Sequence, residues 1–435
     1  MMNRRDALKL LSSVGLTAFT PSLLNRALAQ AMDPAAYTGP LYIVIQANGG
    51  WDVTSFCDPK ENIAGQPIIN TWAQTGTTQK AGNLSYAPFA NNQALFEKYY
   101  SYMLVVNGVD SQTNAHDAGK THNWSGRLSA GFPSFPALVS SIQAPTLPMS
   151  FLTNGGYAET ARLIRATRVN SIAPLNNILF PNTPEILPGD RFFDDDDLDI
   201  ITAASNARLA RLQAQSALLP RQQNNRDIYA ASLASSDGFD AFAALLPSDD
   251  ELQPAVDDQG NPAPLKQQAQ LALLAFKAGV SMTADLTYNV FDTHTNHDAL
   301  QSTGLSNLAD AIDFIWDFAE QQGIADRLTV YVASDFGRTP RYNSNSGKDH
   351  WPIGSAIFMR KNAPWGNRVV GFTDAGHNAM KTNPATLQAD DNSGVLIHPG
   401  HLMDALRTLA GIDNDPITQK FPLNMNEQID FFQSG

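Results

Sequence analysis

The sequence predicts an α/β protein in which a mostly parallel sheet lies between layers of helices. Short apolar, β-branched runs recur along the chain, and segments with apolar residues at every third or fourth position lie between several of them. A strand, a crossover helix and a second strand produce a parallel sheet that is covered on both faces. With 435 residues, 43% of them hydrophobic, the chain can bury a core of this kind.

Four runs have the composition of buried strands. The first follows the Gly39-Pro40 break and ends in Asn48-Gly49-Gly50, as a strand that leads into a functional loop would. A helix is predicted over residues 305–322, where apolar positions repeat at helical spacing before Gly323. The four predicted strands are residues 41–47, 102–106, 283–290 and 328–333.

The middle of the chain has a different composition. Residues 201–245 and 265–280 are predicted to be helical, and the acidic, proline-rich residues 247–264 between them form a solvated linker. We therefore predict a helical insertion at residues 185–280, within an α/β core made of residues 39–184 and 281–435. The acidic run Asp194–Asp197 is interpreted as a solvated loop or helix start in preference to a calcium site.

The first 29 residues have the features of an export signal. Arg4-Arg5, a modest apolar stretch and Ala27-Leu28-Ala29 give a basic region, an apolar region and a small-residue cleavage site. The paired arginines resemble a twin-arginine signal, which predicts export in the folded state by the twin-arginine translocon to the periplasm or beyond. An ordinary amphipathic first helix is the alternative. No later segment is apolar enough for a stable membrane span.

Charge and cysteine content exclude several classes of protein. The formal net charge is −13 and the isoelectric point is near 4.9, so the chain has no electrostatic attraction for nucleic acid. Cys57 is the only cysteine, which rules out a disulfide framework and a cysteine-rich zinc module.

Acids and histidines follow the predicted strands, where a parallel sheet collects its ligands. The densest group, Asp292-Thr293-His294-Thr295-Asn296-His297, supplies a carboxylate and two imidazoles, which are ligands that zinc and similar divalent metals favour. The alternative is a polar loop whose histidines cap the next helix. Further candidates are the metal ligands Asp52, Asp335 and His350, and Arg338, which is predicted to neutralise an oxyanion.

A fifth polar segment, residues 113–127, follows the second strand and enters a helix. Thr113 is the first candidate for a nucleophile, ahead of Thr121 and Ser125, and His116 is a candidate ligand or acid/base. A polar helix N-terminus without chemistry is the alternative. For His398 and His401, beside Pro399-Gly400, we predict a capping or supporting role.

The blocks Gly-Gly-Trp-Asp, Asp-Thr-His-Thr-Asn-His, Ser-Asp-Phe-Gly-Arg-Thr-Pro-Arg and Gly-Lys-Asp-His-Trp-Pro resemble the secreted domain-of-unknown-function family 1501. That family is similar in turn to the alkaline phosphatase and sulfatase superfamily. The resemblance implies an alkaline-phosphatase-like α/β fold with a metal cluster at the sheet edge. It further implies that Asp52, Asp292, Asp335 and His350 are ligands, with His294 or His297 as partner. Phe336 departs from the pattern, because it stands where that superfamily places a ligand histidine.

The leading prediction is an exported, metal-dependent hydrolase of small anionic phosphate or sulfate esters. One or two divalent ions are expected, zinc before calcium, magnesium or manganese. The alternative is a non-catalytic binding or scaffold protein that keeps the fold and a structural metal. A metal-independent esterase is the third reading, without a Gly-x-Ser-x-Gly motif to support it.

Overall fold

The computed structural model describes residues 37–433, except 170, 184–189, 220–221, 224, 227–228, 231–232 and 234–235. The predicted export signal, residues 1–29, lies outside the described residues. None of the helices in the described part is both long and apolar enough to cross a membrane.

A single eight-stranded sheet forms the centre of the described chain. Its strand order is β12-β4-β11-β8-β1-β7-β5-β6, and every neighbouring pair is parallel except the two pairs made by β11. The prediction of a mostly parallel sheet is therefore confirmed. The strands are β1 Leu41–Asn48, β4 Met103–Asp110, β5 Phe151–Thr153, β6 Ala166–Arg168, β7 Thr283–Asn289, β8 Leu328–Ala333, β11 Ile353–Arg360 and β12 Arg368–Val370.

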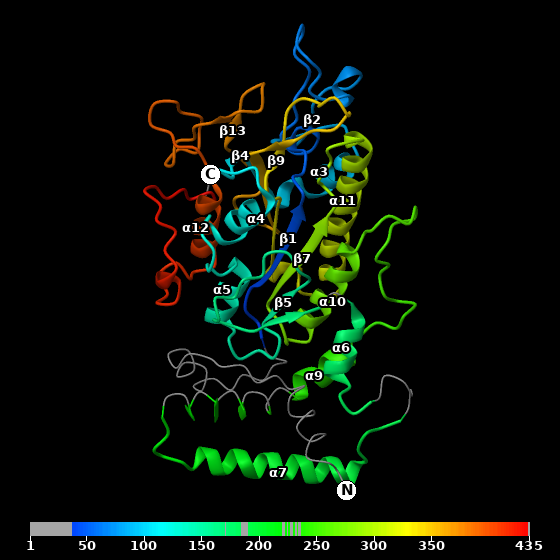
Figure 1. Ribbon diagram of the computed structural model, residues 1–435, viewed down its shortest axis with the longest axis vertical. Coiled ribbons are helices and arrows are strands. Elements are labelled where there is room, and N and C mark those ends of the chain that lie inside the picture. The colour runs from blue at the N-terminus through cyan, green and yellow to red at the C-terminus, as the bar shows by residue number, and fades with distance from the viewer. Residues whose placement is uncertain are drawn as a thin grey trace.

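Helices cover both faces of this sheet. Figure 1 shows α4, α5 and α12 on one side of the sheet and α3, α10 and α11 on the other. The helices are α3 Asn92–Tyr99, α4 His116–Ser125, α5 Phe135–Gln143, α6 Ile172–Leu179, α7 Asp195–Gln213, α9 Ser236–Ala243, α10 Leu265–Lys277, α11 His297–Gln321 and α12 Pro399–Leu409. Small strand pairs lie outside the main sheet: β2 Gln79–Ala81, β3 Leu84–Tyr86, β9 Gly337–Arg338, β10 His350–Trp351, β13 Phe372–Thr373 and β14 Ala379–Met380.

The four strands predicted from the sequence are all present and lie in the core of the sheet. β1 and β8 are buried along their whole length, as expected for strands that are covered on both faces. The predicted helix 305–322 is the second part of α11, which begins eight residues earlier at His297. β11, with its apolar residues 353–360, is an additional strand that we did not predict.

The segment predicted as an insertion contains two kinds of helix. The 19-residue helix α7 has no buried residue and lies apart from the sheet in Figure 1, with Asp194 capping its start through a hydrogen bond to the Asp197 amide. In contrast, α10 packs on β7 and α11 and is buried along most of its length. α10 therefore belongs to the layer that covers the sheet.

The strand directions bring the ends of several strands together at one edge of the sheet. β1, β4, β7 and β8 run the same way, so their carboxyl ends meet at this edge. β11 is antiparallel to β4 and β8, and its amino end lies at the same edge. Residues that follow four strands and residues that precede a fifth are therefore neighbours in space.

Candidate metal centre

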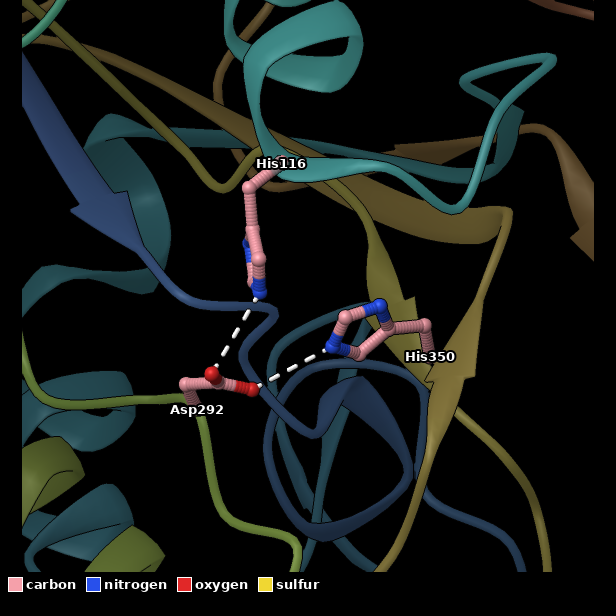
Figure 2. A group of neighbouring side chains, drawn as sticks. All are labelled: His116, Asp292 and His350. Atoms are coloured by element: carbon pink, nitrogen blue, oxygen red, sulfur yellow. Dashed lines mark hydrogen bonds and ion pairs between the residues drawn. The ribbon is translucent and has the colours of Figure 1, made fainter.

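Three histidines surround the carboxylate of Asp292 at this edge. The Nε2 atoms of His294 and His350 lie 3.1 and 3.3 Å from its Oδ1 atom. The Nε2 atom of His116 lies 3.4 Å from the other carboxylate oxygen, Oδ2. Figure 2 shows His116 and His350 pointing at Asp292 from two sides, and the ligand atoms of these three residues all lie within 4.8 Å of one another.

The other nitrogen of each ring is held by the protein. The His116 Nδ1 atom bonds to Asp335 Oδ2 at 2.6 Å, and the His294 Nδ1 atom bonds to Asp349 Oδ1 at 2.8 Å. The partner of His350 Nδ1 is the backbone oxygen of Asn114, at 2.7 Å. Carboxylates and carbonyls only accept hydrogen bonds, so each Nδ1 is the donor and each neutral ring has its lone pair at Nε2. This arrangement is typical of metal-ligating histidines.

The Nε2 atoms differ in their contacts: that of His350 lies within hydrogen-bonding distance of Asp292 Oδ1, at 3.3 Å. His116 Nε2 is buried and makes no hydrogen bond. The Nε2 atoms of His294 and His350 are only 3.0 Å apart. Two nitrogen lone pairs at this distance repel one another unless a proton or a metal ion lies between them. A cation held by Asp292, His116 and His350 would give the Nε2 atoms of these two rings a partner.

Each residue reaches the cluster from a different element. His116 is the first residue of α4, a few residues after β4, and Asp292 follows β7. Asp335 follows β8, and His350 lies in β10, just before β11. Buried Phe336 packs against the cluster, and the centre of its ring lies 4.8 Å from that of His116 and 4.7 Å from that of His350. A phenyl ring cannot ligate, so its role here is packing.

Neighbouring groups favour the ionised forms of the two carboxylates, Asp292 and Asp335, and the protonated form of His116. Burial alone would raise the pKa of Asp292, but the hydrogen bond and charge of Arg338, together with His350 and His116, outweigh burial and lower this pKa to about 2. Burial also opposes ionisation of Asp335, yet its bond to His116 lowers the pKa of Asp335. The same bond raises the pKa of His116. Two carboxylates thus stay ionised and attract positive charge to the cluster.

Arg338 is fully buried and its guanidinium is committed to the protein. It donates to Asp292 Oδ1 at 2.6 Å, to the Gly50 carbonyl at 2.9 Å, to the Lys348 carbonyl at 2.9 Å and to the carbonyl of Gly49. The predicted contact between Arg338 and a substrate oxyanion does not fit this placement. Arg338 instead holds Asp292 and the loop after β1 in position.

Two of the predicted ligands, Asp52 and His297, lie in a separate buried cluster. Lys348 Nζ donates to Asp52 Oδ2 at 2.7 Å, and His297 Nε2 donates to the same oxygen at 2.9 Å. The side chains of all three are at most 1% exposed. Burial would raise the pKa of Asp52, but Lys348 and His297 hold it well below its ordinary value. The structure places Asp52 and His297 apart from Asp292. The Lys348 ammonium balances the charge of Asp52, where the prediction placed a metal ion.

The Thr293 hydroxyl also belongs to this buried cluster, but the cluster is not a catalytic triad. Gln301 Nε2 donates to Thr293 Oγ1 at 3.0 Å, and that hydroxyl donates to His297 Nδ1 at 2.7 Å. Thr293 is 1% exposed, so no substrate can reach it. The hydroxyl, imidazole and carboxylate here form a sealed structural network.

A cleft of about 650 Å³ opens beside the metal-binding cluster. Thr113 does not line it: its hydroxyl accepts a bond from the Ala115 amide at 3.2 Å, within the loop before α4. Thr121 does line the cleft, whereas Ser125 is buried and donates to the Thr121 carbonyl. The lining residues are Asn48, Gly49, His116, Asp117, Lys120, Thr121, Gly156, Tyr157, Asn289 and Asp292.

Sequence reasoning missed several residues of the site. Asp349, which orients His294, lies directly before the predicted ligand His350, and Lys348 precedes both, so attention to the whole block would have identified them. Lys120 lines the cleft one helical turn after His116, a spacing that places both on one face of a helix. The Asn114 carbonyl could not be found from sequence, because a backbone oxygen carries no residue-type signal.

The architecture and the cluster define a class: an α/β protein with a candidate metal centre at the edge of a mostly parallel sheet. A family model described as "Protein of unknown function (DUF1501)" matches residues 194–414, just over half of the chain. The chain belongs to this family. No curated protein matches the sequence.

Several solved structures are similar to the chain, at low identity. A sulfatase from Pseudoalteromonas sp. is 10% identical, with a TM-score of 0.37, and the match covers 100% of this chain and 77% of the sulfatase. The lipoteichoic acid synthase LtaP from Listeria monocytogenes is 10% identical, with a TM-score of 0.35 and coverage of 98% and 81%. TAB5 alkaline phosphatase is 12% identical, with a TM-score of 0.35 and coverage of 76% and 94%. Similarity at this level does not establish an activity.

Proposed function

We propose that the chain is an exported, metal-dependent hydrolase of phosphate or sulfate esters. The observation that carries the proposal is the convergence of three imidazole Nε2 atoms, each with its Nδ1 held by an acceptor, on the carboxylate of Asp292 beside a cleft. An unpartnered His116 Nε2 and two further imidazole nitrogens beside an ionised carboxylate form a donor set that suits a divalent metal.

The donor set favours zinc. Two imidazoles and one carboxylate, from His116, His350 and Asp292, are ligands that zinc prefers, whereas calcium and magnesium prefer oxygen donors. A single ion suffices, because in the described residues one group of acids and histidines has ligand atoms close enough to share a metal.

A bound zinc ion would lower the pKa of a water molecule and screen the negative charge of an ester. The protein itself supplies the rest. Asp335, Asp349 and the Asn114 carbonyl fix the orientation of the three rings, and Arg338 fixes Asp292. Lys120 and Thr121 line the cleft, where the Lys120 ammonium can meet an anionic ester; the Thr121 hydroxyl donates to the Asp117 carbonyl at 2.8 Å.

Export is the second part of the proposal and rests on residues 1–29 alone. A twin-arginine signal would carry the folded protein across the membrane, with the translocon as a transient partner. A metal site assembled from four separate segments forms only on folding, and export in the folded state would preserve it.

A binding or scaffold role with a structural metal is the second candidate. Phe336 fills the position of a potential ligand, and the hydroxyl of Thr113, the first candidate nucleophile, bonds within its own loop. Such a protein would bind metal at the same residues without turnover.

The test combines metal analysis with a substrate screen. Purified protein should contain zinc and hydrolyse 4-nitrophenyl phosphate or 4-nitrophenyl sulfate. Asp292→Asn should lose both metal and turnover, while Asp326→Asn, a surface control in an exposed ion pair, should keep both. Metal without turnover on a broad panel of phosphate and sulfate esters would favour the scaffold role, and protein that binds no metal would refute both.

A further inference from the structure

The tetrapeptide Asn-Gly-Gly-aromatic occurs twice, each time at the carboxyl end of a strand of the main sheet. Residues 48–51 follow β1, and residues 154–157 follow β5; we refer to them as the first and second Gly-Gly loops. The two glycines have φ values of +114° and +82° in the first loop and +116° and +69° in the second. The glycines of the two loops therefore have closely similar φ values, all in the region that favours glycine.

The first Gly-Gly loop shows what such a loop binds. The amides of Gly49 and Gly50 both donate to one carboxylate oxygen, Oδ1 of Asp335, at 2.9 and 2.7 Å. Consecutive amides that point at one position form a nest for an anionic oxygen. In this loop the protein supplies the anion itself.

The second Gly-Gly loop has the same amides without an internal anion. The Gly155 amide reaches only the hydroxyl of Thr153, at 3.2 Å, and the Gly156 amide meets no acceptor within the described ranges. The loop is nevertheless held in place, because the Tyr157 amide donates to Gln46 Oε1 at 2.8 Å and Gln46 Nε2 donates to the Tyr157 carbonyl at 3.1 Å. Gly156 and Tyr157 line the cleft.

An arginine stands beside this loop. Arg168 ends β6, the neighbour of β5, and is paired in register with Thr153. Its Nη2 atom would lie 3.8 Å from a Cβ atom added at Gly155. Arg168 is exposed and forms no ion pair with any residue that the structure describes. A guanidinium beside a loop with an unpaired amide, that of Gly156, is a suitable environment for an oxyanion.

We propose that the second Gly-Gly loop and Arg168 form an oxyanion subsite beside the cleft, which Gly156 and Tyr157 line. Its ligand is a sulfate, phosphate or carboxylate group. The subsite itself involves none of the metal-binding residues. The inference rests on the proposed function in one respect: if the cleft binds an ester at the metal centre, the subsite selects substrates with a second anionic group.

Titration with inorganic sulfate, followed by calorimetry, tests the subsite directly. The protein is first treated with a chelator, so that sulfate bound to a metal ion does not contribute to the signal. The wild-type protein should bind sulfate, and Arg168→Gln should weaken its affinity roughly tenfold or more. The matched control is Arg165→Gln, an exposed arginine three residues earlier, which should change the affinity by less than about twofold. Absent binding in the wild type, or equal losses in both variants, would overturn the proposal.

The loop itself is tested by NMR on protein labelled with ¹⁵N-glycine. Sulfate should shift the Gly155 and Gly156 amide resonances in the wild type but not in Arg168→Gln, and resonances that stay fixed in both proteins would overturn the assignment. Repeating the titration with added zinc separates the two proposals. If zinc does not bind, the metal-dependent function fails while sulfate binding at the subsite persists.

Discussion

Two clusters of carboxylate and imidazole lie at the same edge of the sheet and behave in opposite ways. The open cluster consists of His116, Asp292, His294 and His350, and the sealed cluster consists of Asp52, His297, Thr293 and Lys348. In the sealed cluster every hydrogen-bonding atom of Asp52, His297 and Lys348 has a partner inside the protein, and the side chains are at most 1% exposed. In the open cluster Asp292 is half exposed and the His116 Nε2 atom has no hydrogen bond.

The difference shows what separates a structural polar network from a candidate site. Both clusters contain residue types that bind metals, so residue type does not distinguish them. A cation does not distinguish them either, because Lys348 pairs with Asp52 and Arg338 pairs with Asp292. The distinguishing features are the exposure of Asp292 and the unpartnered Nε2 atom of His116, which leave room for a ligand in the open cluster.

The largest expected effect is on the sealed cluster. Lys348→Met keeps the length of the side chain but leaves the Asp52 carboxylate buried without its cation. We expect a loss of about 3–5 kcal/mol in the free energy of unfolding, measured by urea denaturation at neutral pH. Lys98→Met, which removes an exposed lysine from an ion pair with Asp313, should cost about 1 kcal/mol or less.

A double variant sharpens this prediction. Asp52→Asn combined with Lys348→Met removes the orphaned charge, so the double variant should be more stable than Lys348→Met alone. If Lys348→Met costs no more than Lys98→Met, or if the double variant is the less stable one, the sealed cluster is not held by this ion pair.

The open cluster should respond in metal affinity instead of stability. His350→Ala removes one of the converging nitrogens, and we expect zinc affinity to fall roughly a hundredfold or more. The side chain of His350 is 23% exposed, so the free energy of unfolding of the metal-free protein should change by about 0.5 kcal/mol or less. Zinc competition with a chromophoric chelator measures the affinity, and unchanged affinity would remove His350 from the site.

A smaller effect is expected from the residue that orients His116. Asp335→Asn keeps an oxygen for the Gly49 and Gly50 amides but places an amide next to His116 Nδ1, which disfavours the tautomer with its lone pair at Nε2. Zinc affinity should fall about 10–100-fold. Equal affinity of the variant and the wild type would show that Asp335 does not control the ring.

The smallest effect is on pH dependence. The bond from Asp335 raises the pKa of His116, so a proton competes with the metal for Nε2 below this raised pKa. Zinc affinity should therefore fall as the pH drops below this raised pKa. In Asp335→Asn the decline should begin at lower pH, which potentiometric zinc titrations would detect. An unchanged onset would contradict this origin of the shift.

The sequence was sufficient for the fold class and for the edge of the sheet. The buried runs of β1, β4, β7 and β8 were identified by composition, and acids placed directly after parallel strands had to meet. The predicted capping role of His398 and His401 is confirmed, since each side chain accepts a backbone N–H at the start of α12. β11 was missed because its apolar run is interrupted by Gly354 and Ser355.

The division of the histidines between two clusters could not be predicted. His294 and His297 are three residues apart, yet His297 begins α11 and points into the core, while His294 stays in the exposed loop before it. Likewise Lys348 is fully buried and His350, two residues later, reaches Asp292. These directions depend on how the loops pack against segments far away in the sequence, and one-dimensional spacing does not contain that information.

The most direct test of the central claim is the zinc content of the protein and of two histidine variants, one from each cluster. Metal analysis after dialysis should find about one zinc ion per chain in the wild type, a similar amount in His297→Gln and almost none in His350→Ala. Loss of zinc from folded His297→Gln with retention in His350→Ala, or a wild-type protein that binds no zinc, would contradict the account.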